Sequence, residues 1–201
     1  MPKKTEFFDI VDENDQVIGQ ALRSECHGNP ALVHRVAHVL VFDSNGRLLL
    51  QKRSMRKDIQ PGRWDTSVGG HLDPGEGYHE AACREMREEL GIGRIPLTWL
   101  YYSKIRNEIE SENVSTYLAR YDGEVRFAPD EIDEVRFWSS EEIDAALGTG
   151  VFTPNFEEEW AMWRKWNRNN EGRGTRDVGR ESCLSSGTCA IKRNALSLEK
   201  K

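Results

Sequence analysis

The sequence predicts an α+β protein, an α/β/α sandwich in which helices cover both faces of a mixed central sheet. Three observations favour this class. Short apolar runs between turn residues indicate strands over much of residues 6–138, helical periodicity is confined to three segments, and the two signals mix without a regular βαβ alternation. The length of 201 residues suits one domain, or one domain with a tail.

The first part of the chain is predicted to form strands. Residues 6–11 and 16–23 flank the turn sequence Asp-Glu-Asn-Asp, which predicts an N-terminal β-hairpin extension over residues 5–23. Residues 35–43 and 47–53 flank Asn45-Gly46, a strong hairpin signal. After a polar loop that ends in Pro61-Gly62, residues 64–71 predict one further strand.

Three helices are predicted among the remaining strands 97–105, 114–121 and 134–138. The clearest covers residues 77–90 and ends at Gly91, a residue type that favours a helix C-terminus. Ser139 is a suitable N-cap for a helix over residues 139–147. In a helix over residues 155–167, three aromatic residues share one face and are expected to pack on the sheet: Phe156, Trp160 and Trp163.

Charge and composition divide the chain into two parts. Residues 168–201 hold eight basic and four acidic residues and no aromatic residue, which predicts a disordered basic tail after a domain over residues 1–167. The overall net charge of −6 leaves −10 on the body. An acidic body argues against nucleic-acid partners, and the apolar runs are too short for a membrane span. We expect a cytoplasmic protein without a signal peptide.

Residues 70–92 contain the densest group of chemically active side chains. On the predicted helix, Glu85, Glu88 and Glu89 stand at i, i+3 and i+4 and form one cluster, away from an apolar stripe of Ala82, Cys83, Met86 and Leu90. Charge pattern alone favours a solvated acidic face. A compact set of carboxylates also suits Mg²⁺ or Mn²⁺, which prefer oxygen ligands.

This segment resembles the Nudix hydrolase box, G-x5-E-x7-R-E-U-x-E-E-x-G-U, where U is a bulky aliphatic residue. All nine specified positions match over 23 residues: Gly70, Glu76, Arg84, Glu85, Met86, Glu88, Glu89, Gly91 and Ile92. The resemblance implies a Nudix fold and metal-dependent hydrolysis of a diphosphate linkage. It implies that the Gly70 carbonyl and the three helix carboxylates hold metal, that Glu76 pairs with Arg84, and that Glu85 orients or deprotonates the attacking water.

The resemblance extends over residues 5–165 to the Nudix branch that contains type 1 isopentenyl-diphosphate isomerase. That isomerase has a second metal site of three histidines and two glutamates, and the matching residues here are His27, His34, His71, Glu110 and Glu112. Such a mixed set suits a second, transition-metal ion. Each histidine could equally be a semi-buried residue without a metal. His38 is expected to pack within the sheet and His79 to face solvent.

Two residues that the isomerases use for their reaction are absent. Gly69 replaces the cysteine that transfers a proton, and Asn155 replaces the tryptophan that stabilises a carbocation. Because the hydrolytic box is intact, the sequence favours a pyrophosphohydrolase that acts on a nucleotide-like or other organic diphosphate. An isopentenyl-diphosphate delta-isomerase and a Nudix-fold binding module without turnover remain as alternatives.

The substrate does not follow from these residues. Lys52 and Arg53 precede the polar loop and could bind a substrate phosphate, or simply form a solvated strand end. Trp64 could stack on a substrate ring or pack beside the site. Glu112 is a further candidate for a carboxylate that reaches the reaction centre as ligand or base. The expected partner is a small-molecule diphosphate, and the exposed edges of the N-terminal hairpin would allow a homodimer.

Overall fold

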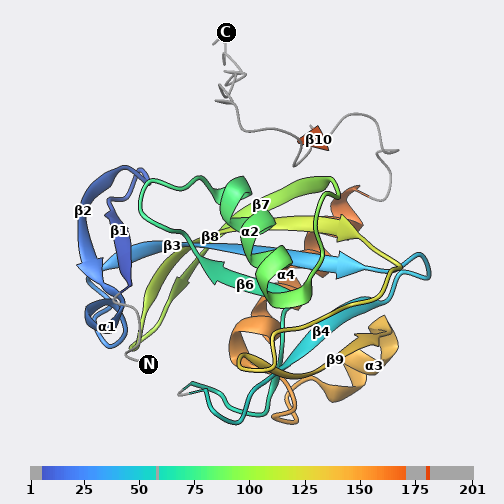
Figure 1. Cartoon of the computed structure of the whole chain (residues 1–201). Helices are drawn as coiled ribbons and strands as arrows, with labels where there is room; N and C mark the ends of the chain where they lie inside the picture. Colours follow the sequence, from blue (N-terminus) through green and yellow to red (C-terminus); the bar gives the residue numbers. More distant parts are fainter. Residues whose placement is uncertain (1–5, 58, 171–179, 182–201) are drawn as a thin grey trace, which may run out of the picture.

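The computed structural model describes residues 6–57, 59–170 and 180–181. Its strands are β1 Phe7–Val11, β2 Val17–Leu22, β3 Val33–Phe42, β4 Leu48–Arg53, β5 Trp64–Asp65, β6 Val68–His71, β7 Leu97–Arg106, β8 Ser111–Arg120, β9 Ile132–Trp138 and β10 Arg180–Glu181. Its helices are α1 Arg23–Cys26, α2 Tyr78–Leu90, α3 Ser140–Ala146 and α4 Pro154–Asn170. Figure 1 shows α2 in front of the sheet and α4 behind it.

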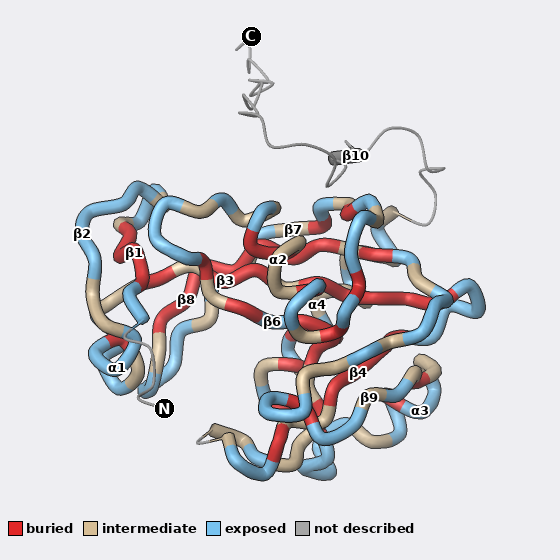
Figure 2. The backbone as a smooth tube through the Cα atoms, in the orientation of Figure 1, coloured by how far each residue is buried: buried red, intermediate tan, exposed pale blue. Residues whose placement is uncertain are grey.

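The central sheet is mixed. Its strand order is β10-β7-β8-β3-β4-β5, with β6 paired to β3 and β9 paired to β4. Strands β3 and β8 run parallel over ten residue pairs, whereas the other pairings are antiparallel. The long central strands are buried along most of their length, and the outer turns are exposed (Figure 2). This arrangement confirms the predicted α+β sandwich.

Strand β3 separates two apolar layers because successive side chains alternate between its faces. Val39 and Val41 pack with Ala82 and Met86 of α2 on one side. Leu40 and Phe42 pack with Phe156 and Trp160 of α4, and with the partly buried Trp163, on the other. The aromatic face of α4 therefore packs on the sheet as predicted. In the predicted apolar stripe of α2, Ala82, Met86 and Leu90 are buried and Cys83 is partly buried; Ala81, outside the predicted stripe, is buried as well.

Residues 64–71 form two short strands instead of the single predicted one. Strand β5 pairs with β4, whereas β6 pairs with β3. The two central strands are paired in register only at Phe42 and Leu48 next to their turn. Further along, the Ser67 hydroxyl donates to the Leu49 carbonyl at 2.5 Å and accepts from the Val41 amide at 2.9 Å. Ser67 thus links β3 and β4 where the two strands separate. The segment 64–71 can therefore pair with β4 through β5 and with β3 through β6.

The N-terminal hairpin forms its own two-stranded sheet beside the start of β3. The predicted turn at residues 12–15 is present, with the Asp12 carboxylate accepting from the Asn14 and Gln16 amides. The predicted strand 16–23 is shorter, because the chain turns into α1 at Arg23. This short helix carries Cys26 into a small core with Phe8 and Ile10 and leaves His27 at its C-terminal end.

Two helix ends follow the sequence signals. Gly91 ends α2 with a φ of 67°, and Ser139 caps α3 by accepting from the Glu142 amide. Helix α4 continues to Asn170, so the first three residues of the predicted tail are helical. Apart from β10, the remainder of that tail lies outside the described residues. In the described part of the chain, no helix has the length and apolarity required to cross a membrane.

Candidate functional site

Arg84 is the centre of the polar network in the 70–92 segment. Its guanidinium group donates to both carboxylate oxygens of Glu76, with Nε–Oε1 and Nη2–Oε2 distances of 2.9 and 2.7 Å. It also donates to Glu85, to Glu88 and to the His71 carbonyl. Such a planar fork binds a carboxylate through two parallel bonds. The Glu76–Arg84 pair therefore attaches the loop after β6 to α2.

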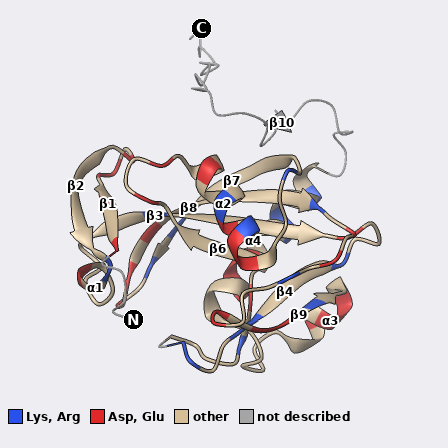
Figure 3. Cartoon of the chain, in the orientation of Figure 1, with Lys and Arg blue, Asp and Glu red and all other residues tan. Residues whose placement is uncertain are grey.

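Gly70 and Glu85 are in direct contact across the gap between β6 and α2. A Cβ on Gly70 would coincide with the carboxyl end of the Glu85 side chain. The Glu85 carboxylate is thereby held against the Gly70 backbone, the group whose carbonyl the Nudix resemblance assigns to metal. Burial raises the pKa of Glu85 although Arg84 opposes the shift. Figure 3 shows that acidic and basic residues alternate along α2.

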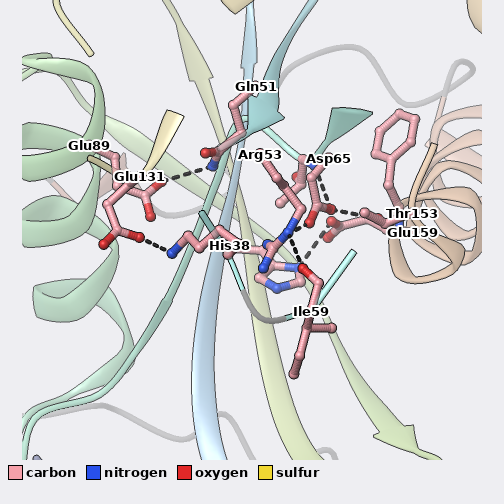
Figure 4. Close-up of polar contacts among 12 residues, drawn as sticks. His38, Gln51, Arg53, Ile59, Asp65, Glu89, Glu131, Thr153 and Glu159 are labelled. Carbon is pink, nitrogen blue, oxygen red and sulfur yellow. Dashed lines mark hydrogen bonds and ion pairs between the residues drawn. The ribbon is translucent and has the colours of Figure 1, made fainter. Parts of the chain in front are cut away.

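Glu88 and Glu89 lie on the same helix in different environments. The Glu88 side chain is 56% exposed and reaches Arg84, whereas Glu89 is partly buried and accepts a hydrogen bond of 2.9 Å from Gln51 Nε2 of β4 (Figure 4). Burial, with Glu85 nearby, raises the pKa of Glu89 to about 8. A cation would favour the charged forms of these carboxylates. Gln51 is a site residue that the sequence interpretation missed.

A second group of candidate ligands lies on the opposite face of β3 and β6. His34 Nε2 and His71 Nε2 each lie 3.4 Å from Glu112 Oε1, and one ligand atom from each of the three residues fits within 4.8 Å. Strand pairing explains the convergence, because His34 is opposite Glu112 and His71 is opposite Val36. The predicted set is therefore brought together in part by the sheet itself.

The other two predicted members lie next to this group. The His27 ring centroid is 6.4 Å from that of His34 and 5.8 Å from that of His71. A hydrogen bond of 2.7 Å from the Gly28 amide to the Ile109 carbonyl holds this end of α1 near Glu110. Glu110 itself interacts with Glu112 and His34 and accepts a hydrogen bond from Asn155.

The chemistry of the histidine group fits a bound cation. The Nε2 atoms of His27, His34 and His71 are buried and have no hydrogen-bond partner among the described residues. Burial lowers the pKa of His27 to about 4 and also lowers that of His71, so both rings are neutral at pH 7. Burial raises the pKa of Glu112, but His34 and His71 lower it below its usual value. Neutral imidazoles with an ionised carboxylate are the forms that bind metal.

The N-terminal hairpin covers the histidine group. The Phe8 ring stacks on His71 with centroids 4.3 Å apart and on His34 at 5.1 Å. Its neighbour Asp9 is buried and accepts from the Arg35 guanidinium and from the Gly75 amide in the loop before α2. The sequence predicted the hairpin but not these contacts, because they join residues far apart in the chain.

His38 differs from its expected role. Its Nδ1 lies 3.0 Å from Glu159 Oε2, so the ring is part of a buried ion pair between β3 and α4, not an apolar packing residue. The prediction was wrong because it rested on the apolar neighbours Val36 and Leu40, whereas α4 places the Glu159 carboxylate next to His38. His79 is partly buried and packs edge-to-face on Tyr117 at 5.8 Å, so it does not simply face solvent.

The predicted substrate-binding residues have mixed positions. Arg53 donates to the Ile59 carbonyl and to Asp65, both at 3.1 Å, and these bonds occupy it within the protein. Lys52 is partly buried on β4. Trp64 is 9% exposed and packs edge-to-face on Trp138. Of its two expected roles, this position favours packing over stacking on a substrate ring. Lys57, which the sequence interpretation omitted, pairs with Glu131 and lies within the electrostatic influence of Glu85 and Glu89.

Comparison with known proteins agrees with this geometry. A family model described as the NUDIX domain matches residues 32–156. An uncharacterised Nudix hydrolase of Yersinia pestis is 36% identical over 168 residues, covering 83% of this chain and 88% of that protein. An isopentenyl-diphosphate Delta-isomerase of Streptomyces coelicolor is 33% identical over 155 residues, covering 74% and 79%.

The crystal structure of DR0079 from Deinococcus radiodurans has the same fold, with a TM-score of 0.67 and 29% identity over 80% of this chain and 98% of that one. The family match includes the whole 70–92 segment, the Arg84 network and the histidines at positions 34 and 71. The similarity to an isomerase agrees with the predicted branch. The chain belongs to the Nudix hydrolase family, whose enzymes act on phosphorus-containing acid anhydrides.

Proposed function

We propose that this protein is a metal-dependent pyrophosphohydrolase in which water attacks a phosphorus of a diphosphate linkage in a nucleotide-like or other organic diphosphate. The observation that carries the proposal is the contact of Glu85 with Gly70 beside Glu89, within the network that Arg84 fixes. Glu85, Glu88, Glu89 and the Gly70 carbonyl would hold Mg²⁺ or Mn²⁺. A bound divalent ion neutralises diphosphate charge and lowers the pKa of bound water.

The protein side chains have separable roles in this proposal. Arg84 positions Glu85 and Glu88, and Gln51 positions Glu89. Glu85 is the candidate that orients or deprotonates the water. Glu112 belongs with His34 and His71, so we assign it, with His27 and Glu110, to a second site for a transition-metal ion. That assignment replaces a direct role of Glu112 as a base.

Isomerisation of isopentenyl diphosphate is the second candidate, and the histidine group with the Streptomyces relative favours it. Two positions oppose it. Gly69 has no group that transfers a proton, and Asn155 donates a hydrogen bond to Glu110 where the isomerases place an aromatic ring. The hydrolytic carboxylates are complete, so hydrolysis accounts for more of the site.

The test is product release from a panel of diphosphates by the purified protein, with Mg²⁺ and with Mn²⁺. Nucleotide sugars, nucleoside triphosphates, dinucleotides, thiamine diphosphate and isopentenyl diphosphate should be included. We expect phosphate-bearing fragments from at least one compound, and none from Glu88→Gln or Glu89→Gln proteins that retain the wild-type melting temperature. Conversion of isopentenyl diphosphate to its isomer without release would support the second candidate instead.

A further inference from the structure

The buried pair of His38 and Glu159 lies on the sheet face that also carries the histidine group. Glu159 accepts at Oε2 from His38 Nδ1 and at Oε1 from the Thr116 hydroxyl of β8, each at 3.0 Å. The carboxylate is therefore fixed by contacts with two strands. Its bond to His38, which Figure 4 shows, fixes the orientation of the His38 ring. Among the described residues, no group accepts a hydrogen bond from the other ring nitrogen, Nε2.

His38 is held in its charged form. Burial lowers the pKa of His38, but Glu159, with Glu112 and Asp65 further away, raises it to about 9. Both ring nitrogens therefore carry protons at pH 7, and Nε2–H is a charged donor without a partner in the described part of the chain. Charged donors form short, strong hydrogen bonds with phosphate oxygens.

The absence of a side chain at Gly69 leaves one edge of this ring accessible. Gly69 is opposite His38 in the β3–β6 pairing and is exposed. A Cβ at Gly69 would lie 3.3 Å from His38 Cδ2 and 3.4 Å from Nε2. The His38 side chain keeps 12% of its surface exposed, against 3% for Glu159. The Nε2 edge is thus the part of the pair that faces outward.

Strand β6 carries Gly69, which is opposite His38, and also one residue of each candidate metal group, Gly70 and His71. Along β6, Gly70 contacts Glu85 on the α2 side, whereas Gly69 and His71 lie on the opposite side. Stability alone does not require a charged pair at this position. Proteins in which apolar residues of similar volume replace a buried ion pair are often equally stable. The neighbours of His38 on this face of β3, Val36 and Leu40, are buried and apolar.

We propose that His38 is a substrate-binding residue whose Nε2–H donates a hydrogen bond to a phosphate oxygen at a subsite next to Gly69. The inference rests on the proposed function and extends it by naming a protein donor for the phosphate chain. Glu159 and Thr116 position the ring, and Gly69 provides the access.

Gly69→Ala tests the subsite without removing a charged group. The φ of Gly69 lies outside the left-handed region, so alanine adds a methyl group next to Nε2 without backbone strain. With the panel compound of highest turnover, we expect KM to rise about tenfold, the loss of roughly one hydrogen bond to a charged group, while kcat stays within about twofold. Gly19→Ala on β2, where a Cβ meets nothing within 4 Å, is the matched control.

A binding measurement separates this inference from the proposed function. Inorganic phosphate is titrated into metal-free protein labelled with ¹⁵N-histidine, and the His38 Nε2 resonance is followed. We expect a saturable shift in the wild type and in Gly19→Ala and its loss in Gly69→Ala. This result would support the subsite even if the panel showed no hydrolysis. A His38 Nε2 resonance that does not shift with phosphate, or an unchanged KM in Gly69→Ala, would overturn the proposal. Neither result would contradict hydrolysis itself.

Discussion

Gly70 and Glu85 lie so close that the carboxyl end of Glu85 occupies the space of a side chain at position 70. The φ of Gly70 lies outside the left-handed region, so glycine is required here for space and not for backbone conformation. The contact joins β6 to α2 and places a carboxylate against the backbone group that the proposed metal site uses.

Gly70→Ala should therefore displace Glu85. We expect kcat on the best panel substrate to fall about 100-fold, because a displacement near 1 Å in a reactive site has an effect of this size. Gly19→Ala should retain the wild-type rate, and circular dichroism should show that both proteins are folded. A Gly70→Ala enzyme with wild-type kcat would exclude this contact from the site.

Gln51 should affect metal binding through Glu89, because its side-chain amide donates a hydrogen bond of 2.9 Å to the Glu89 carboxylate. In Gln51→Ala, Mn²⁺ affinity measured by titration should fall about 10- to 100-fold, the usual effect of losing a partner of a metal ligand. Gln16→Ala, in the exposed hairpin turn, is the control. Equal Mn²⁺ affinity in Gln51→Ala and the wild type would place the metal away from Glu89.

The histidine group should bind an ion that is independent of the α2 carboxylates. Equilibrium dialysis with Zn²⁺ or Mn²⁺ should show that Glu112→Gln loses one bound equivalent, because its carboxylate lies 3.4 Å from both His34 Nε2 and His71 Nε2. Glu108→Gln, at an exposed position in the loop before β8, should keep the wild-type stoichiometry. Identical stoichiometry in both variants would argue that the group is structural.

Arg84→Lys should destabilise the protein although it preserves the charge. Lysine cannot reproduce the two parallel bonds to Glu76, so we expect a loss of roughly 1–3 kcal/mol in the free energy of unfolding. Urea denaturation would measure it, with Arg87→Lys at an exposed position of α2 as the control. If the two variants were equally stable, the fork would have no structural importance.

The stabilising effect of the His38–Glu159 pair should depend on pH. The pKa of His38 is raised from 6.5 to about 9, so its contribution is complete below pH 6.5 and is lost as the pH rises through 9. The pKa of Glu159 is lowered, because His38 outweighs the effect of burial, so its contribution is lost as the pH falls below 4.5. The stability difference between the wild type and His38→Gln should shrink from pH 6.5 toward pH 10, and a constant difference over this range would contradict the pairing.

The parts of the site that depend on local spacing could be predicted from the sequence. The apolar face at Ala82, Met86 and Leu90 follows from helical periodicity. The Glu76–Arg84 pair was implied by the resemblance to the Nudix box. The Gln51–Glu89 and His38–Glu159 contacts could not be predicted. The first pair is separated by 38 positions in the sequence and the second by 121, so each contact depends on how the sheet and helices pack. Helical or strand periodicity carries no information about such pairs.

The division of residues 64–71 into two strands has a similar cause. The apolar pattern there fits one continuous strand, but the Ser67 hydroxyl bonds to both β3 and β4 and marks the change of partner. The hairpin was predictable from its turn sequence, whereas the stacking of Phe8 on His71 depends on where the whole hairpin docks. Local patterns therefore predicted the elements, and tertiary contacts decided which elements share a site.

The most direct test of the central claim is turnover in H₂¹⁸O, with mass spectrometry of the products from the best panel substrate. Attack of water at phosphorus predicts two phosphate-bearing fragments, one of which carries a single ¹⁸O for each turnover. The label should be absent when Mg²⁺ and Mn²⁺ are removed and in Glu89→Gln. A product with the same mass as the substrate, formed without fragment release or phosphate label, would contradict hydrolysis.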